Sequence, residues 1–167
     1  SEMCIRDRTS ADIKDEIASE VKAITLSGDR PPHLAALIVG NDGASLTYVG
    51  SKVKACEKVG FDSTLLSLPE SISEQELLTK VNGLNNDDKI DGYIVQLPLP
   101  NHIDTQKVLM AVDPKKDVDG FHPTNFGKMA LKLPTFISAT PNGIMELLKR
   151  YKVSTEGKHT VVIGRSD

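Results

Sequence analysis

Residues 34–39 read LAALIV, an uninterrupted apolar run with the length of one β-strand. Strands that are apolar on both faces are typical of parallel sheets, where helices cover each side. Turn-forming residues bound the run, with Pro31-Pro32 before it and Gly40 after it. The stretch therefore predicts a central strand of a parallel α/β sheet.

Helical patterns lie on both sides of this strand. Upstream, Thr9 and Asp12 resemble a capping box, with Asp in place of the usual Glu. The helix they open carries one apolar stripe that we expect to face a core: Ile13, Ile17, Val21 and Ile24. Downstream, Ser45 is placed to cap a second helix that ends near Gly60.

The alternation continues beyond Gly60. The pattern predicts a strand over 61–68, a helix opened by the capping box Ser73–Glu76, and a strand over 90–97. The order βαβαβ predicts a parallel α/β domain. Pro98-Leu99-Pro100 ends the last strand, so Gln96 is expected to point into a cleft at the carboxyl end of the sheet.

The C-terminal part carries a different set of signals. Thr140 as N-cap and Pro141 at the first helical position predict a helix to about Tyr151. A strand is predicted over 159–163, followed by the turn that begins with Gly164. A strand that enters such a turn is how a dinucleotide-binding unit starts, although a plain strand-to-turn junction is the alternative.

Composition limits the possible partners. The 167 residues carry a net charge of -3, which gives no basic field for nucleic acid or an anionic membrane. The longest apolar run is far shorter than the roughly 20 residues that span a membrane, so we expect a cytoplasmic protein. Cys4 and Cys56 are too few for a disulfide framework and are expected to be reduced thiols.

Two segments carry candidate chemistry. Tyr48 and Lys52 share one helix face at i and i+4, which suits a planar heterocyclic substrate beside a titratable amine. The alternative is a solvated helix face that carries one Tyr. Asp113–Gly120 is a charged loop whose carboxylates suggest a metal site, but it lacks the longer acidic series of a calcium loop.

Together these segments resemble the bifunctional methylenetetrahydrofolate dehydrogenase/methenyltetrahydrofolate cyclohydrolase family. The resemblance extends from about Ala11 to Ser166. Its most specific motifs are Tyr48–Lys52, Val95–Pro100, Lys116–Gly120, Thr140-Pro141 with Gly143, and Val162–Ser166.

The resemblance assigns roles to individual residues. It implies that Tyr48 stacks on the pterin, Lys52 is the central acid/base, Gln96 tunes that lysine, and Asp119 anchors the pterin ring. Asp119 as a folate ligand displaces the metal alternative, because a carboxylate accepts paired hydrogen bonds from an aminopyrimidinone edge. The substrate-binding set implied is Tyr48, Gln96, Leu97, Pro98 and Asp119, and the cofactor-binding set is Gly164, Arg165 and Ser166.

The resemblance also implies an organisation and a reaction. Residues 1–8 are atypical for the family, and residues 9–139 form the folate-binding catalytic domain. A connecting helix and loop over residues 140–156 lead to residues 157–167, which start a Rossmann-like NAD(P)-binding domain. The implied enzyme oxidises 5,10-methylenetetrahydrofolate with NADP, NAD not being excluded, and hydrolyses the product to 10-formyltetrahydrofolate. Family members continue through a complete cofactor domain, so we expect a truncated piece of a homodimeric parent, or else a folate-binding module without turnover.

Overall fold

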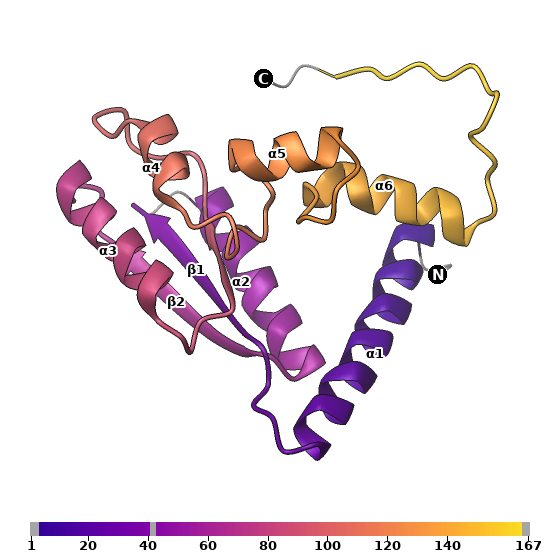
Figure 1. The fold of residues 1–167 in the computed structure, drawn as a ribbon, viewed down its shortest axis with the longest axis horizontal. Helices are drawn as coiled ribbons and strands as arrows, with labels where there is room; N and C mark the ends of the chain where they lie inside the picture. Colours follow the sequence, from indigo (N-terminus) through magenta and orange to yellow (C-terminus); the bar gives the residue numbers. More distant parts are fainter. Residues whose placement is uncertain (1–3, 41–42, 165–167) are drawn as a thin grey trace.

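The computed structural model describes residues 4–40 and 43–164, apart from the side chain of Ala44. Helices and strands alternate through the first two thirds of the chain, and the rest holds two helices and segments without regular structure (Figure 1). The elements are α1 (Ile5–Leu26), β1 (His33–Val39), α2 (Gly43–Val59), β2 (Asp62–Leu68), α3 (Glu74–Asn86), β3 (Gly92–Val95), α4 (Thr105–Ala111), α5 (Pro123–Ala130) and α6 (Ala139–Arg150).

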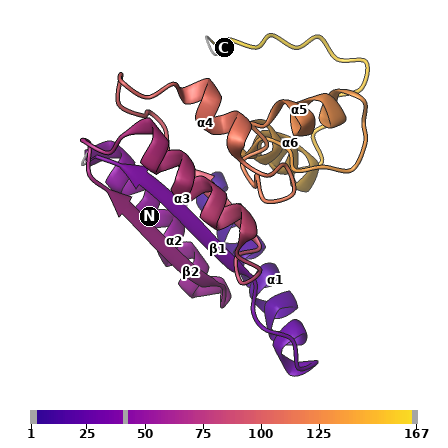
Figure 2. The ribbon, with the colours of Figure 1, turned by 60° about the vertical axis from the view of Figure 1, so that its left-hand side comes forward.

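The sheet confirms the prediction made from residues 34–39. Its strands are parallel in the order β2-β1-β3, with Ala36 opposite Leu65 on one side and Ile94 on the other. Figure 2 shows α2 and α3 on opposite sides of this sheet. Both faces of β1 are therefore covered, as its uninterrupted apolar sequence predicts.

Alternate residues of β1 serve two separate cores. Ala35, Leu37 and Val39 pack with the buried side chains of α3, which are Leu77, Val81 and Leu84. Ala36 and Ile38 pack with Val49 of α2 on the other face. Burying a Leu, Ile or Val side chain contributes about 1.5–3 kcal/mol, so the burial of Leu37, Ile38 and Val39 stabilises this part of the fold.

The predicted boundaries hold well around the sheet. Ser73 accepts a hydrogen bond from Glu76 N at 3.2 Å and Glu76 Oε2 accepts one from Ser73 N at 3.0 Å, which confirms the capping box. Gly60, at φ 83°, follows the end of α2 as expected. β3 is shorter than the predicted strand over 90–97, although Gln96 N still donates to Leu37 O at 2.8 Å.

Three predicted helix starts are wrong. α1 begins at Ile5, and the Thr9 hydroxyl donates to Ile5 O at 3.0 Å from inside the helix instead of capping it. α2 begins at Gly43, so Ser45 lies within its first turn. α6 begins at Ala139 with Ser138 as N-cap, which puts Pro141 at the third helical position, where a missing N–H is still tolerated.

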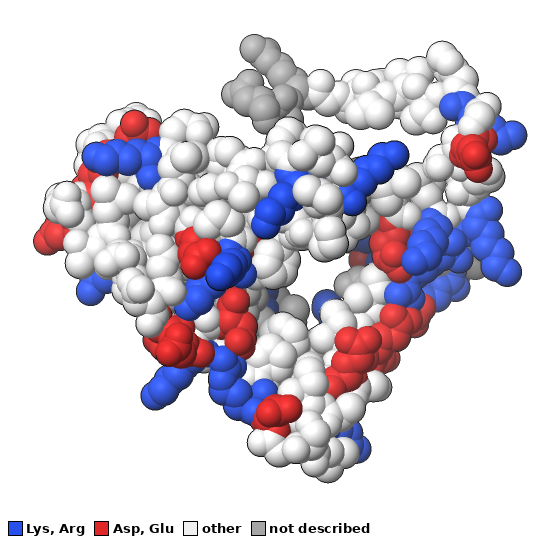
Figure 3. All heavy atoms as spheres, viewed as in Figure 1, with Lys and Arg blue, Asp and Glu red and all other residues white. Residues whose placement is uncertain are grey.

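The apolar stripe of α1 is only partly covered. Val21 is buried, whereas Ile24 is 38% exposed. Charged side chains of both signs follow the outer side of α1, in the lower right of the view in Figure 3. The Arg150 guanidinium joins α6 to α1 through two hydrogen bonds to Glu16, of 2.8 and 2.6 Å.

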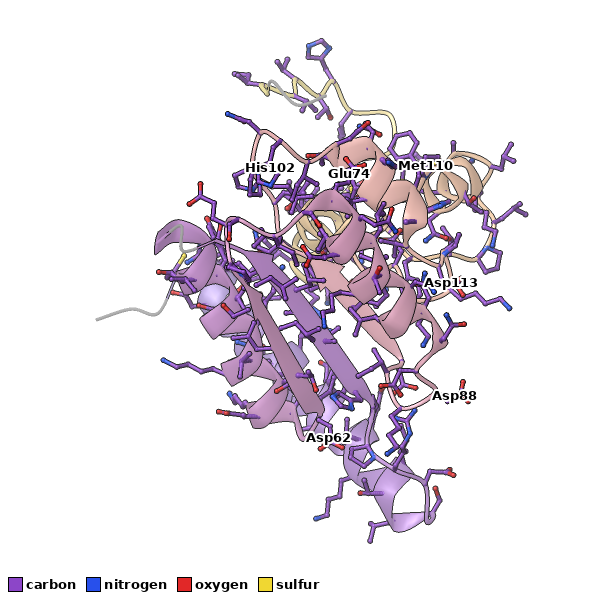
Figure 4. The ribbon with its side chains drawn as sticks, turned by 90° about the vertical axis from the view of Figure 1, so that its left-hand side faces the viewer. Asp62, Glu74, Asp88, His102, Met110 and Asp113 are labelled. Carbon is purple, nitrogen blue, oxygen red and sulfur yellow. The ribbon has the colours of Figure 1, made fainter. Side chains whose placement is uncertain are left out.

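Helices α4 and α5 were not predicted from the sequence. Asp104 caps α4 by accepting from Lys107 N at 3.2 Å, and His122 caps α5 with Pro123 following it in the first turn. His102 Nε2 donates to Ile72 O at 2.9 Å, and Asp104 N donates to Glu74 Oε2 at 3.0 Å. Figure 4 shows Glu74 and His102 together at the end of the sheet opposite Asp62, so α4 is fixed at the carboxyl end of the strands.

The predicted strand over 159–163 is not formed. Residues 158–164 have no regular secondary structure, and the segment after α6 runs apart from the other elements (Figure 1). Val162 is 88% and Ile163 is 96% exposed. A strand needs a neighbour for its backbone hydrogen bonds, and the described part of the chain offers none there. In that same part, no helix is long and apolar enough to cross a membrane.

Candidate functional site

Lys52 and Gln96 meet at the carboxyl end of β3. Lys52 projects from α2, and its Nζ donates to Gln96 Oε1 at 3.4 Å. Gln96 directly follows β3, and its Nε2 donates to Leu97 O at 2.9 Å, which fixes the amide with its oxygen toward the lysine. The two residues that the family resemblance assigns to one site are therefore in contact.

A cavity of about 920 Å³ opens beside this pair. Four of the predicted site residues line it: Lys52, Gln96, Leu97 and Asp119. The rest of its lining comes from β3, α4, the Gly120–Phe126 region and the start of α6: Val95, Gln106, Leu109, Gly120, Phe121, Phe126, Ser138, Ala139, Thr140 and Pro141. The volume is sufficient for a drug-sized heterocyclic ligand.

Two predicted residues lie outside this lining. The Tyr48 side chain is 66% exposed and does not line the cavity, although it lies one helical turn from Lys52. Pro98 lines a separate hollow of about 460 Å³, together with Val39, Gly40 and Glu70. The structure thus brings the amine, the amide and one carboxylate together, and it leaves the aromatic ring at the surface.

Asp119 is held at the cavity by the turn that contains it. Asp117, two residues earlier, is 5% exposed, and its carboxylate accepts from His122 N at 2.8 Å and Phe121 N at 3.3 Å. Asp113 Oδ1 accepts from Lys115 N at 2.8 Å. These two carboxylates therefore order the loop backbone, and Asp119 is the acidic group that faces the cavity.

The electrostatics of Asp119 reflect its position. Burial raises the pKa of the Asp119 carboxyl, Lys52 opposes this rise, and the nearby Asp117 adds to it. Desolvation disfavours a carboxylate, and a like charge disfavours it further, whereas a nearby amine favours it. Asp119 therefore carries a charge that the fold alone does not favour, as expected of a group that receives a ligand.

This shift gives a prediction for Asp119→Asn. Because the folded-state pKa is raised, ionised Asp119 destabilises the fold at pH values above it, and this effect disappears as the pH falls through the folded-state pKa. The variant should have a higher free energy of unfolding than the wild type at pH 7, and the gain should shrink between pH 7 and pH 4. Urea unfolding at several pH values measures it; a gain that does not change with pH would contradict the assignment.

Gly120 joins the two sides of the cavity. Its φ is 69°, and a Cβ at this position would lie 2.9 Å from Phe136 O and 2.9 Å from Ser138 N. The turn with Asp119 therefore approaches the backbone that leads into α6 as closely as a glycine allows.

Several lining residues were missed by the sequence analysis. Gln106 and Leu109 belong to α4, which was not recognised, and Ser138 and Ala139 precede the predicted helix start. Phe121 and Phe126 are 47% and 59% exposed, and both follow the Asp-Val-Asp-Gly motif closely. Large apolar residues beside a polar motif are the signal that would have identified this wall.

Of the three predicted cofactor-binding residues, only Gly164 is among the residues that the structure describes. Gly164 is exposed, and nothing lies within 4 Å of a Cβ built on it. Arg165 and Ser166 lie outside the described residues.

Comparison with known families agrees with this geometry. The family sequence model for the tetrahydrofolate dehydrogenase/cyclohydrolase catalytic domain matches residues 6–119 of this chain. The chain belongs to the tetrahydrofolate dehydrogenase/cyclohydrolase family. The NAD(P)-binding domain of the tetrahydrofolate dehydrogenase/cyclohydrolase family matches residues 138–167, so the cavity draws its lining from both matched segments.

Relatives within the tetrahydrofolate dehydrogenase/cyclohydrolase family are close in sequence. The bifunctional protein FolD of Flavobacterium johnsoniae is 71% identical over 159 residues, which are 95% of this chain and 54% of that protein. FolD of Bacteroides thetaiotaomicron is 58% identical over 158 residues, which are 95% and 54% of the two chains. The chain thus spans about half the length of the curated relatives it matches.

Solved structures from the same family have the same fold. The bifunctional FolD methylenetetrahydrofolate dehydrogenase/cyclohydrolase of Campylobacter jejuni has a TM-score of 0.90 at 46% identity, covering 94% of this chain and 56% of that one. The Trypanosoma brucei enzyme, solved with NADP and an inhibitor, has a TM-score of 0.85 at 32% identity, covering 89% and 51%.

Proposed function

We propose that this chain carries the folate site of a bifunctional enzyme of one-carbon metabolism. The enzyme oxidises 5,10-methylenetetrahydrofolate to 5,10-methenyltetrahydrofolate with NADP and hydrolyses that product to 10-formyltetrahydrofolate. The observation that supports this most strongly is the placement of Lys52, Gln96 and Asp119 on one cavity in a member of this family.

Lys52 is the proposed acid/base of the hydrolytic step. Water adds to the cationic methenyl carbon, and the amine of Lys52 accepts the proton that the water loses. The bond from this carbon to N5 then breaks as the lysine returns the proton to N5, and the hydroxyl on the carbon releases its proton to solvent to become the carbonyl of the N10-formyl group. Gln96 Oε1, 3.4 Å from Nζ, orients the amine through both transfers.

Asp119 is the proposed anchor of the pterin ring. An ionised carboxylate accepts two parallel hydrogen bonds from an aminopyrimidinone edge, and this contact also compensates the cost of burying the charge. The exposed ring of Tyr48, on the same helix as Lys52, is available to stack on the outer face of the pterin. Leu97 supplies an apolar contact from the cavity wall.

NADP supplies the hydride acceptor of the oxidative step. The chain was expected to contribute Gly164, Arg165 and Ser166 to its site, and of these only Gly164 is described. Residues 158–164 have no regular structure, and the last of them are almost fully exposed, so they do not fit a dinucleotide site by themselves. We therefore assign no side chain of residues 4–40 or 43–164 to the hydride transfer.

Asp119→Ala is expected to weaken folate binding. Loss of two charge-assisted hydrogen bonds should raise the Kd for 5-formyltetrahydrofolate by about 100-fold. Isothermal titration of the chain measures this. Asp88→Ala is the matched control, because Asp88 is exposed and does not line the cavity. An Asp119→Ala variant that binds as tightly as the wild type would remove the anchoring role.

The reaction itself is tested by hydrolysis of 5,10-methenyltetrahydrofolate, followed by the loss of its near-ultraviolet absorbance. The chain is compared with a chimera in which the remaining C-terminal half of the Flavobacterium johnsoniae relative is joined after Asp167. Hydrolysis by either protein supports the proposal, and activity of the chimera alone means that the site needs the second half. Folate binding without hydrolysis by either protein would leave a folate-binding module.

A further inference from the structure

Three buried or part-buried polar side chains connect the two walls of the cavity. They are Asp117, Asn125 and Thr135, which we call the polar bridge. Asn125 Nδ2 donates to Asp117 Oδ2 at 2.9 Å, and the Thr135 hydroxyl donates to Asn125 Oδ1 at 2.7 Å. Asn125 is 2% exposed, so its amide depends on these partners.

Each end of the polar bridge lies close in sequence to the cavity lining. Asp117 closes the turn that carries Asp119, through its hydrogen bonds from His122 N and Phe121 N. Thr135 begins the segment that reaches Ser138 at the start of α6. A second donation by Asn125 Nδ2, to Pro114 O at 2.8 Å, ties the same amide to the start of the charged loop.

The polar bridge contains no ligand-facing group of its own. Neither Asp117, Asn125 nor Thr135 lines the cavity, and the Asn125 side chain uses both its oxygen and its nitrogen within the bridge and the loop. A buried network whose members are all hydrogen-bonded favours one arrangement of the segments it joins. Here those segments are the Asp119 turn and the segment before α6.

We propose that Asp117, Asn125 and Thr135 are positioning residues that hold the Asp119 carboxylate at the angle needed to accept the pterin. This inference rests on the proposed function, since it assigns the bridge a role in folate recognition through Asp119. The bridge acts at a distance from the ligand, and its contribution passes entirely through Asp119.

Thr135→Val tests the positioning role of the polar bridge, because valine has nearly the same shape as threonine. It removes the hydroxyl and leaves Asn125 Oδ1 without that donor, and it should raise the Kd for 5-formyltetrahydrofolate by about tenfold. Thr135→Ser keeps a hydroxyl and should bind within about twofold of the wild type. Thr79→Val is the matched control, because the exposed Thr79 hydroxyl donates only to Gln75 O within α3.

A double-mutant cycle separates positioning from general destabilisation. In the Asp119→Ala background, Thr135→Val should change the Kd by less than about twofold, since the group that the bridge positions is then gone. An equal loss in both backgrounds, or none in the wild type, would overturn the proposal. Circular dichroism checks folding, and Thr135→Ala carries the same test if Thr135→Val does not fold.

The two proposals fail in different ways. A wild-type chain that does not bind 5-formyltetrahydrofolate would overturn the proposed function, and the role of the polar bridge with it. Binding that depends on Asp119 but not on Thr135 would overturn the role of the bridge alone.

Discussion

Lys52→Met should slow the hydrolysis of 5,10-methenyltetrahydrofolate by about 100- to 10,000-fold, the contribution typical of a positioned acid/base. Methionine preserves the length of the side chain and its apolar contacts but has no proton to exchange. Affinity for 5-formyltetrahydrofolate should stay within about tenfold of the wild type, because Asp119 still anchors the ring. The measurement is the initial rate of hydrolysis, made with the chain if it is active and otherwise with its chimera.

Lys54→Met is the control for this variant. Lys54 is exposed on the same helix, two positions further on, so its side chain points away from that of Lys52. Its hydrolytic rate should match the wild type. Full activity in Lys52→Met, or an equal loss in both variants, would remove Lys52 from the mechanism.

Gly120→Ala should lower the free energy of unfolding by about 2–4 kcal/mol. Two effects combine: a left-handed backbone at φ 69° disfavours any residue with a Cβ, and that Cβ would lie 2.9 Å from Phe136 O and Ser138 N. The backbone of residues 136–138 has to move away from the turn, which also opens the cavity. Urea unfolding of the variant gives the energy, and folate titration gives the effect on the site.

Gly83→Ala is the control, and it should have the opposite effect on the free energy of unfolding. Gly83 lies within α3, and nothing approaches within 4 Å of a Cβ built there. Alanine should therefore stabilise the fold by about 0.5–1 kcal/mol through its better helix propensity. A Gly120→Ala variant as stable as the wild type would mean that the turn and the 136–138 backbone are not in contact as described.

The sheet was predictable from sequence because its signals are local, whereas the pairing of Lys52 with Gln96 was implied only by the family resemblance. The apolar run of β1 requires cover on both faces, and the capping box at Ser73 requires a helix after it. Gln96 was predicted in the cleft because it ends a buried strand directly before Pro98, and the 3.4 Å contact with Lys52 agrees. The motif resemblance supplied the roles of Tyr48, Lys52, Gln96 and Asp119.

The features of the fold and the site that were not predicted depend mainly on contacts between segments that are distant in the sequence. Two helix starts were misplaced because side chains suited to capping also occur inside helices, as Thr9 does in α1 and Ser45 does in the first turn of α2. α4 is short, and its place depends on the bonds of His102 and Asp104 to Ile72 and Glu74, which no local pattern reveals. The bond between Thr135 and Asn125 is likewise a product of folding, so the polar bridge was invisible in the sequence.

A crystal structure of the chain with 5-formyltetrahydrofolate tests the central claim most directly. The pterin ring should occupy the cavity of about 920 Å³, with its amino edge within about 3 Å of the Asp119 carboxylate and its N5 side toward Lys52. A ring bound in the separate hollow beside Pro98 and Glu70, or bound in the cavity without contact to Asp119, would contradict the account.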